Sequence, residues 1–238
     1  MYGGDTEEGG LLTSDAFSEA SIRRGFMRKV YSILSLQLAI TAAVAGLFFI
    51  EPVKLYARQN PWLMWIAFIP ILICMMIFAC CHEVRRKSPG NLVCLGIFTI
   101  AEGFMMGCII SVYEVSEVMM AIGITIVVVF GLTIFALQTK FDFTAIGGVL
   151  IVAVLCLMMF GLFAVFFPYN PIVNIVYASI GAFIFGVYIV FDTQLMMGGK
   201  HKYALDPEEY IFASLKLYLD IINLFLFILQ IIGNARNT

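Results

Sequence analysis

Charged residues are scarce in this sequence. Asp, Glu, Lys and Arg make up 13% of its 238 residues and hydrophobic residues 62%, whereas globular proteins carry about 25% charged residues. A water-soluble fold has no use for so much apolar surface, so we expect an integral membrane protein with one domain. The net charge of −2 argues against nucleic acid as a partner.

Motifs of common enzymes and metal sites are also missing. The sequence contains no Walker loop, no Gly-x-Ser-x-Gly and no His-Glu-x-x-His. Its six cysteines lie in apolar segments and lack the spacing of a disulfide framework or a zinc finger. We therefore expect neither an enzyme nor a bound cofactor.

Long apolar runs are what the sequence does contain. A spanning helix needs about 20 apolar residues, and seven segments qualify. They cover about 30–50, 62–82, 91–112, 117–138, 144–167, 172–196 and 209–232. Glycine and alanine scattered inside these runs favour closely packed helices over barrel strands. The sequence therefore predicts an all-α membrane protein with seven transmembrane helices joined by short loops.

The chain begins with a polar segment. Residues 1–29 are first Gly-rich and acidic and then basic, without the short cationic region of a signal peptide. We expect a disordered cytosolic tail over 1–29, with order setting in near Ser21, and a seven-helix membrane domain over 30–238.

Lys and Arg predict the orientation, because cytosolic loops carry more of them. One side of the predicted bundle has ten and the other has three. The ten are Arg23, Arg24, Arg28, Lys29, Arg85, Arg86, Lys87, Lys140, Lys200 and Lys202, and the three are Lys54, Arg58 and Arg236. We expect a cytosolic N-terminus and, after seven spans, a C-terminus on the opposite side. A re-entrant last segment is the alternative, because that segment carries Lys216, Asp220 and Asn223.

Two aspartates lie within the last two apolar segments, Asp192 in the sixth and Asp220 in the seventh. A charge in a membrane helix costs about 2.5–3.5 kcal/mol on insertion scales. The short connection between the segments makes them antiparallel neighbours, so the two carboxyls can meet. If they do, they cannot both ionise cheaply, and the pair holds a proton and senses pH. Doubly ionised, the pair is an oxygen site suited to Ca²⁺.

The structural alternative gives these acids no function. Asp192 then reaches the membrane interface, and Asp220 is a buried hydrogen-bond acceptor. An intramembrane aspartyl protease also uses two such aspartates, but it carries Gly-x-Gly-Asp and Pro-Ala-Leu elements. Here Leu217-Tyr218-Leu219 precedes Asp220 and no Pro-Ala-Leu occurs, which argues against a protease.

Three further polar residues surround this pattern. Lys216 lies four residues before Asp220 and on one helix face with it, so it either neutralises Asp220 or supplies a cation that competes with Ca²⁺. Asn223 adds a carbonyl oxygen on nearly the same face. Glu102 lies in the middle of its own segment and is the partner of Lys216, a protonated packing residue or part of an ion path.

Arg85 and Arg86 follow the second apolar segment. Their simplest interpretation is a positive anchor on the cytosolic side. The alternative is that one of them reaches the aspartate pair and locks it shut.

Several runs of the sequence resemble the transmembrane Bax-inhibitor-motif family. The run 214–225, Ser-Leu-Lys-Leu-Tyr-Leu-Asp-Ile-Ile-Asn-Leu-Phe, is similar to the family signature. The runs 192–196, 198–201 and 207–211 resemble its lifeguard branch, which includes glutamate-receptor-associated and Golgi anti-apoptotic members, and 23–31 fits as well. The resemblance extends from about residue 21 to the C-terminus.

This resemblance implies six helices packed around a central seventh. It also implies a passive, pH-sensitive Ca²⁺ leak from intracellular stores and inhibition of apoptosis. The proton-sensing pair would be Asp192 with Asp220, and the arginine latch would be Arg85 or Arg86. Lys216 departs from the family, in which that position is a small polar residue, Ser or Asn.

We expect Ca²⁺ as the permeant ion and the endoplasmic reticulum or Golgi as the location, with the plasma membrane or endosome as alternatives. One alternative function is a non-conducting scaffold in the bilayer that binds receptors or Bcl-type apoptosis regulators. Another is a proton-coupled transporter, which predicts an internal repeat that the two halves of the sequence do not show.

Overall fold

The computed structural model describes residues 5–81, 88–164, 166, 170–198 and 205–236, with side chains from Ser21 onward. Within these residues the chain is helical and has no strand. The α-helices are α1 (Asp5–Gly46), α2 (Glu51–Gln59), α3 (Leu63–Cys80), α5 (Gly90–Ile110), α6 (Val115–Gln138), α7 (Gly147–Ala164), α8 (Pro171–Met197) and α9 (Tyr210–Ala235). Short 3-10 turns are η1 (Leu47–Phe49), η2 (Phe143–Ile146) and η3 (Pro207–Glu209).

Seven of the described helices are long and apolar enough to cross a membrane. Their spans begin or end within a few residues of the predicted segments, except that the first starts earlier, at Ser21. The prediction of an all-α seven-helix membrane protein is therefore confirmed. Helix α1 already begins at Asp5, within the expected tail, and the division into 1–29 and 30–238 stays a prediction.

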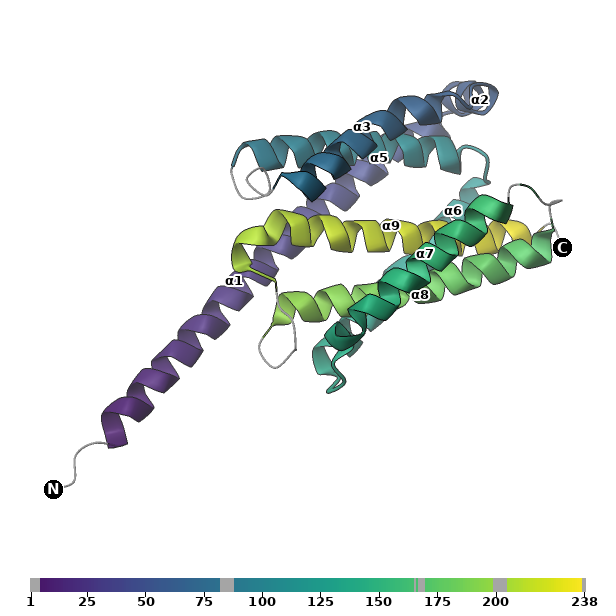
Figure 1. Ribbon diagram of the computed structural model, residues 1–238. Helices are drawn as coiled ribbons and strands as arrows, with labels where there is room; N and C mark the ends of the chain where they lie inside the picture. Colours follow the sequence, from purple (N-terminus) through teal and green to yellow (C-terminus); the bar gives the residue numbers. More distant parts are fainter. Residues whose placement is uncertain (1–4, 82–87, 165, 167–169, 199–204, 237–238) are drawn as a thin grey trace.

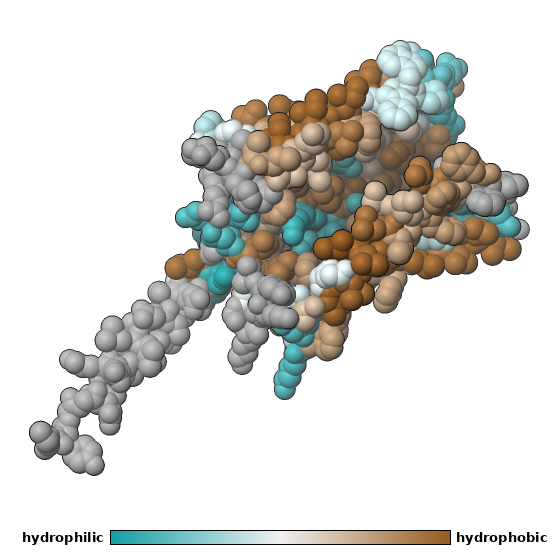
Figure 2. All heavy atoms as spheres, in the orientation of Figure 1, coloured by the Kyte–Doolittle hydropathy of each residue, from teal (hydrophilic) through white to brown (hydrophobic). Residues whose placement is uncertain are grey.

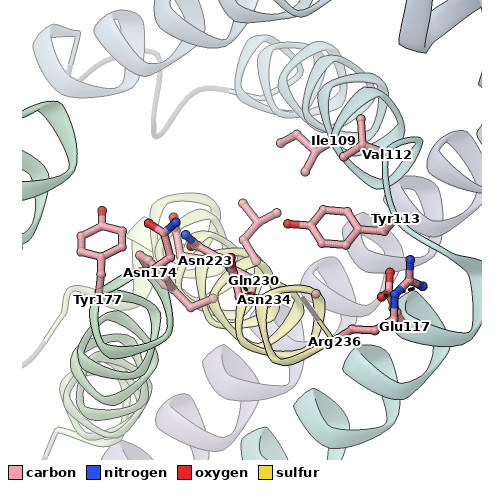
Figure 3. A pocket seen from close by; sticks show the side chains of 13 residues that line it. Ile109, Val112, Tyr113, Glu117, Asn174, Tyr177, Asn223, Gln230, Asn234 and Arg236 are labelled. Carbon is pink, nitrogen blue, oxygen red and sulfur yellow. Dashed lines mark hydrogen bonds and ion pairs between the residues drawn. The ribbon is translucent and has the colours of Figure 1, made fainter. Parts of the chain in front are cut away.

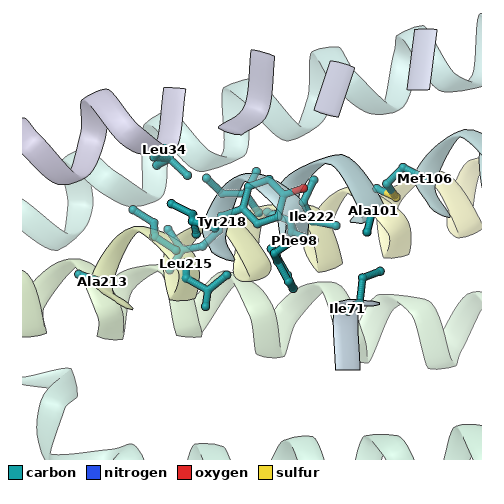
Figure 4. Packing of buried hydrophobic residues seen from close by; sticks show 14 of the residues in the cluster. Leu34, Ile71, Phe98, Ala101, Met106, Ala213, Leu215, Tyr218 and Ile222 are labelled. Carbon is teal, nitrogen blue, oxygen red and sulfur yellow. The ribbon is translucent and has the colours of Figure 1, made fainter. Parts of the chain in front are cut away.

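Helix α9 lies at the centre of the bundle. It packs most extensively on α8 and also on α1, α6 and α5, whereas α3 packs mainly on α5, and α7 on α8 (Figure 1). Figure 4 shows Tyr218 and Leu215 of α9 lying among Phe98 of α5 and Leu34 of α1. The rings of Phe98 and Tyr218 meet edge to face at 6.1 Å. The apolar core therefore lies where α9 packs against α5 and α1.

Apolar side chains also cover the outside of the bundle (Figure 2). Val127 of α6 and Phe183 of α8 are 72% and 73% exposed. Such a surface would be unfavourable in water and suits the hydrocarbon of a bilayer. The exposed apolar surface thus agrees with the composition of the sequence.

Close packing between α5 and the first helix depends on glycine. A Cβ at Gly107 would lie 2.2 Å from the ring of Phe48, and one at Gly103 would lie 3.0 Å from the Cβ of Val44. Small residues at these positions let the two helices approach closely. Gly103 and Gly107 have this purpose, whereas a Cβ at Gly123 or Gly131 would have nothing within 4 Å.

The segment after the first span is a helix, α2, where the sequence analysis expected only a loop. Pro52 lies in its first turn and Arg58 in its last, both favourable positions for these residues. The Arg58 side chain donates a hydrogen bond to the carbonyl of Ser111 at the end of α5. Loop expectations based on hydropathy missed α2 because the segment is too polar and too short to span.

The bundle has two ends, the near end and the far end. The near end holds the start of α5, the end of α8 and the start of α9, and the far end holds the opposite ends of these helices (Figure 1). Helix α9 is an unbroken helix of 26 residues, about 39 Å at 1.5 Å per residue, and it runs from one end to the other. This length favours a full span over the re-entrant alternative.

Candidate functional site: a buried pair of aspartates

Asp192 and Asp220 come together between α8 and α9. Asp192 lies five residues before the end of α8 and Asp220 near the middle of α9. Both are buried, with 4% and 6% of their surface exposed. Their carboxyl groups face each other closely enough to interact directly. The structure therefore satisfies the condition that the sequence left open, that the two carboxyls meet.

The connection after α8 brings the two helices together. Helix α8 ends at Gly198, whose φ of +60° favours glycine. Beyond it, the Leu205 N–H donates to the Leu195 carbonyl at 3.0 Å, and Arg23 donates to the Leu205 carbonyl at 2.6 Å. The chain thereby returns to the end of α8, where α9 begins.

Lys216 is the cation of this site. Its Nζ atom lies 3.9 Å from Oδ1 of Asp192 and 5.1 Å from the centre of the Phe212 ring. It also lies close enough to attract the Asp220 carboxyl. The sequence analysis suggested Asp220 or Glu102 as the partner of Lys216, but the ion pair joins Lys216 of α9 to Asp192 of α8. The Lys216 side chain is one-third exposed at the surface of the bundle.

Two buried carboxyl oxygens of the pair accept no hydrogen bond from the described residues. They are Oδ1 of Asp192 and Oδ2 of Asp220. A single proton between the carboxyls would turn their contact into a hydrogen bond donated by whichever group carries it. Without that proton, two like charges face each other and attract a cation.

The donor set near the pair suits a transient ion better than a resident one. Ca²⁺ takes six to eight oxygen ligands, and the two carboxyls supply at most four oxygens. No group of three or more His, Cys, Asp or Glu side chains able to hold a metal occurs in the described part of the chain. A cation at the pair would therefore keep much of its water.

Tyr188 is a site residue that the sequence analysis missed, and Gln194 holds the segment before α7 against α8. Tyr188 lies one turn before Asp192, near both carboxyls. Gln194 is fully buried; its Nε2 donates to the Phe141 carbonyl at 2.9 Å, and its Oε1 accepts from the Phe143 N–H at 2.8 Å. The four-residue spacing of Tyr188 from Asp192 is the signal that could have found Tyr188.

Glu102 lies apart from the aspartate pair. It is buried on α5 close to Tyr218, whose hydroxyl forms a 2.7 Å hydrogen bond with that of Thr41. Tyr218 is two residues before Asp220 and therefore about 200° away around α9. Glu102 thus belongs to a second polar cluster, on the other side of the central helix.

Of the remaining predicted residues, the structure describes Asn223 but not Arg85 or Arg86. Asn223 lies one turn beyond Asp220, and its side-chain NH₂ donates to the Leu219 carbonyl at 2.8 Å. Arg85 and Arg86 lie outside the described residues. The role of either arginine as a latch stays a prediction.

The structure is that of a polytopic membrane protein, a seven-helix bundle with a pair of acids between its central helix, α9, and the neighbouring α8. The family model described as "Inhibitor of apoptosis-promoting Bax1" matches residues 23–237. The chain belongs to this Bax inhibitor family. Membership implies an anti-apoptotic membrane protein and confirms the resemblance seen in the sequence; it is not known as a family of enzymes.

Several relatives are similar over most of their length. Protein lifeguard 3 of Homo sapiens is 38% identical over 99% of this chain and 78% of its own. Protein lifeguard 3 of Mus musculus is 38% identical over 98% and 78%. Bax inhibitor 1 of Schizosaccharomyces pombe is 37% identical over 91% and 79%. These similarities agree with the lifeguard branch that the motifs indicated.

Proposed function

We propose that this protein is a passive, pH-sensitive Ca²⁺ leak channel of intracellular membranes that lowers store calcium and inhibits apoptosis. The observation that carries the proposal is the contact between the buried carboxyls of Asp192 and Asp220. Such a pair in the membrane is costly, so a structural role alone would be a poor reason to keep it. A titrating pair at a central helix is suited to gating.

The gating step follows from one proton. At low pH the pair shares a proton, and the hydrogen bond holds α8 and α9 together. As pH rises, the proton leaves, two carboxylates repel each other, and the pair becomes a site for a divalent cation. Ca²⁺ flux therefore rises with pH.

Purified protein in liposomes loaded with a Ca²⁺ indicator tests this mechanism. Asp192→Asn together with Asp220→Asn should abolish most of the flux and flatten its pH dependence. Glu102→Gln is the matched control, because it removes another buried acid, one that lies across α9 from the aspartate pair. This variant should keep the pH dependence of the flux. Unchanged flux and pH dependence in the double variant would contradict the mechanism.

A scaffold that binds Bcl-type apoptosis regulators or receptors is the alternative that the family description favours, since that description names Bax1. The same liposomes distinguish the two, because a scaffold gives no flux in the absence of a partner. For the location, we propose the endoplasmic reticulum or Golgi, which imaging of the full-length protein with organelle markers would test.

A further inference from the structure

A polar pocket opens toward the far end of the bundle (Figure 3). Its volume is about 600 Å³, many times the ~30 Å³ share of one water molecule. The ends of α5, α6, α8 and α9 form its walls. Its polar lining residues are Tyr113, Glu117, Asn174, Tyr177, Asn223, Gln230, Asn234 and Arg236.

Helix α9 connects this pocket with the aspartate pair. On an ideal helix Asp220, Asn223, Gln230 and Asn234 lie within about 80° of one another, and Lys216 lies in the same arc. The pocket is lined by this face from Asn223 outward. Asn223 is three residues, about 4.5 Å along the axis, from Asp220. The inner end of the pocket therefore lies one helical turn from the acid pair.

The lining is too polar for a dry cavity in a membrane. Amides and phenols at membrane depth are tolerated where they line a water-filled space. Asn223 already directs its NH₂ to the Leu219 carbonyl, so its oxygen is the group that can face a cation. Figure 3 shows Asn174, Asn223 and Gln230 close together on facing sides of α8 and α9. Such amide oxygens are ligands that Ca²⁺ accepts.

The mouth of the pocket carries a net negative charge. Arg236 at the end of α9 contacts Glu114 at 2.6 Å and Glu117 at 3.1 Å, and two carboxylates with one guanidinium leave one negative charge. Glu117 also accepts a hydrogen bond from the Glu114 N–H at 2.8 Å. A negative mouth raises the local concentration of cations.

We propose that this pocket is the far-side vestibule of the leak path, a water-filled site that takes up hydrated divalent cations and delivers them to Asp220. The proposal rests on the proposed leak function. Asn223 forms its inner end, and the cluster of Glu114, Glu117 and Arg236 forms its mouth. In the closed state the single turn between Asn223 and Asp220 separates the vestibule from the pair.

Thiol labelling tests the vestibule. Asn223→Cys and Gln230→Cys are exposed to a charged, membrane-impermeant thiol reagent from the far side of sealed vesicles, against the background of the unsubstituted protein. Leu229→Cys is the matched control, because Leu229 adjoins Gln230 at the same depth but is fully buried in the core. The vestibule positions should label roughly tenfold faster, since a wet thiol ionises and a dry one does not.

Ca²⁺ flux after labelling tests delivery. A positive charge attached at Asn223→Cys should reduce flux at least to about half, by repelling cations. Labelling no faster than at Leu229→Cys would overturn the vestibule and leave the leak function standing. Fast labelling without a change in flux would overturn delivery to Asp220. Flux that also survives the double aspartate substitution would instead reject the leak mechanism itself.

Discussion

Lys216 places an ammonium group where a permeating cation would interact with Asp192. The 3.9 Å ion pair is too long for a hydrogen bond, and the lysine is tethered by four methylene groups that can swing away. While it stays, it neutralises part of the pair's charge. This chain therefore carries its own substitute cation at the acid pair.

Lys216→Ser should raise Ca²⁺ flux at alkaline pH, where the pair is fully ionised, because the substitute cation is gone. It should also move the midpoint of the flux–pH curve upward by about one unit, since a neighbouring cation favours the ionised pair. Liposome flux measured from acid to alkaline pH gives both values.

Lys216→Arg is the control and should keep flux and midpoint near those of the unsubstituted protein, because the charge remains. If Lys216→Ser and Lys216→Arg behave alike, the charge at this position does not act on the pair.

At the residue scale, the sequence predicted that Asp192 and Asp220 can meet but not the partner of Lys216. Spacing along one helix reveals neighbours at four residues, such as Asp220, because helical geometry is fixed. The ion pair to Asp192 depends on how α8 and α9 are rotated against each other, which no local pattern encodes. Tyr188 lies four residues before Asp192, a spacing that the sequence shows, and only its closeness to Asp220 is a matter of helix packing.

Among the elements, α5 depends most visibly on small side chains. Gly107 faces the Phe48 ring so closely that a Cβ would lie 2.2 Å from it. The ring or the helix must move to admit even one methyl group. The close contact of α5 with the end of the first span is thus possible only because Gly107 has no side chain.

Gly107→Ala should destabilise the protein by about 1–3 kcal/mol through overpacking, measured as a lower thermal midpoint in detergent. Gly123→Ala on α6 is the control, because a Cβ there has nothing within 4 Å, and alanine favours a helix. A Gly107→Ala midpoint equal to that of Gly123→Ala would show that the ring yields without cost.

At the element scale, hydropathy predicted the seven spans well. Continuous apolar length is a direct requirement of the bilayer, so segments such as Gly90–Ile110 are visible in the sequence. The far-end pocket was not predictable in this way. Its walls come from four helix ends, and Asn174 and Asn223 meet there only after the bundle has formed.

For the whole molecule, the expected orientation places the near end in the cytosol. The near-end connections carry most of the Lys and Arg residues, and α9 is long enough to carry the chain across. The vestibule would then face the lumen of the store, which is the side from which Ca²⁺ would leak under the proposed function. Orientation and mechanism are therefore linked.

A glycosylation acceptor sequence appended after Thr238 should be modified in microsomes, whereas one placed before Ser21 should not. Gel mobility before and after enzymatic removal of the glycan gives the result. An acceptor near α2, expected on the lumenal side, is the positive control. Modification at α2 but at neither terminus would favour the re-entrant alternative for α9.

Under the proposed leak function, the tether of Lys216 has a consequence for the cell. A group on a short tether has an effective concentration of the order of millimolar whatever surrounds it, whereas the Ca²⁺ content of a store varies. A full store would displace the ammonium, and a depleted one would let it return to Asp192. The leak would then slow as the store empties and set a lower limit on how far this protein can drain it.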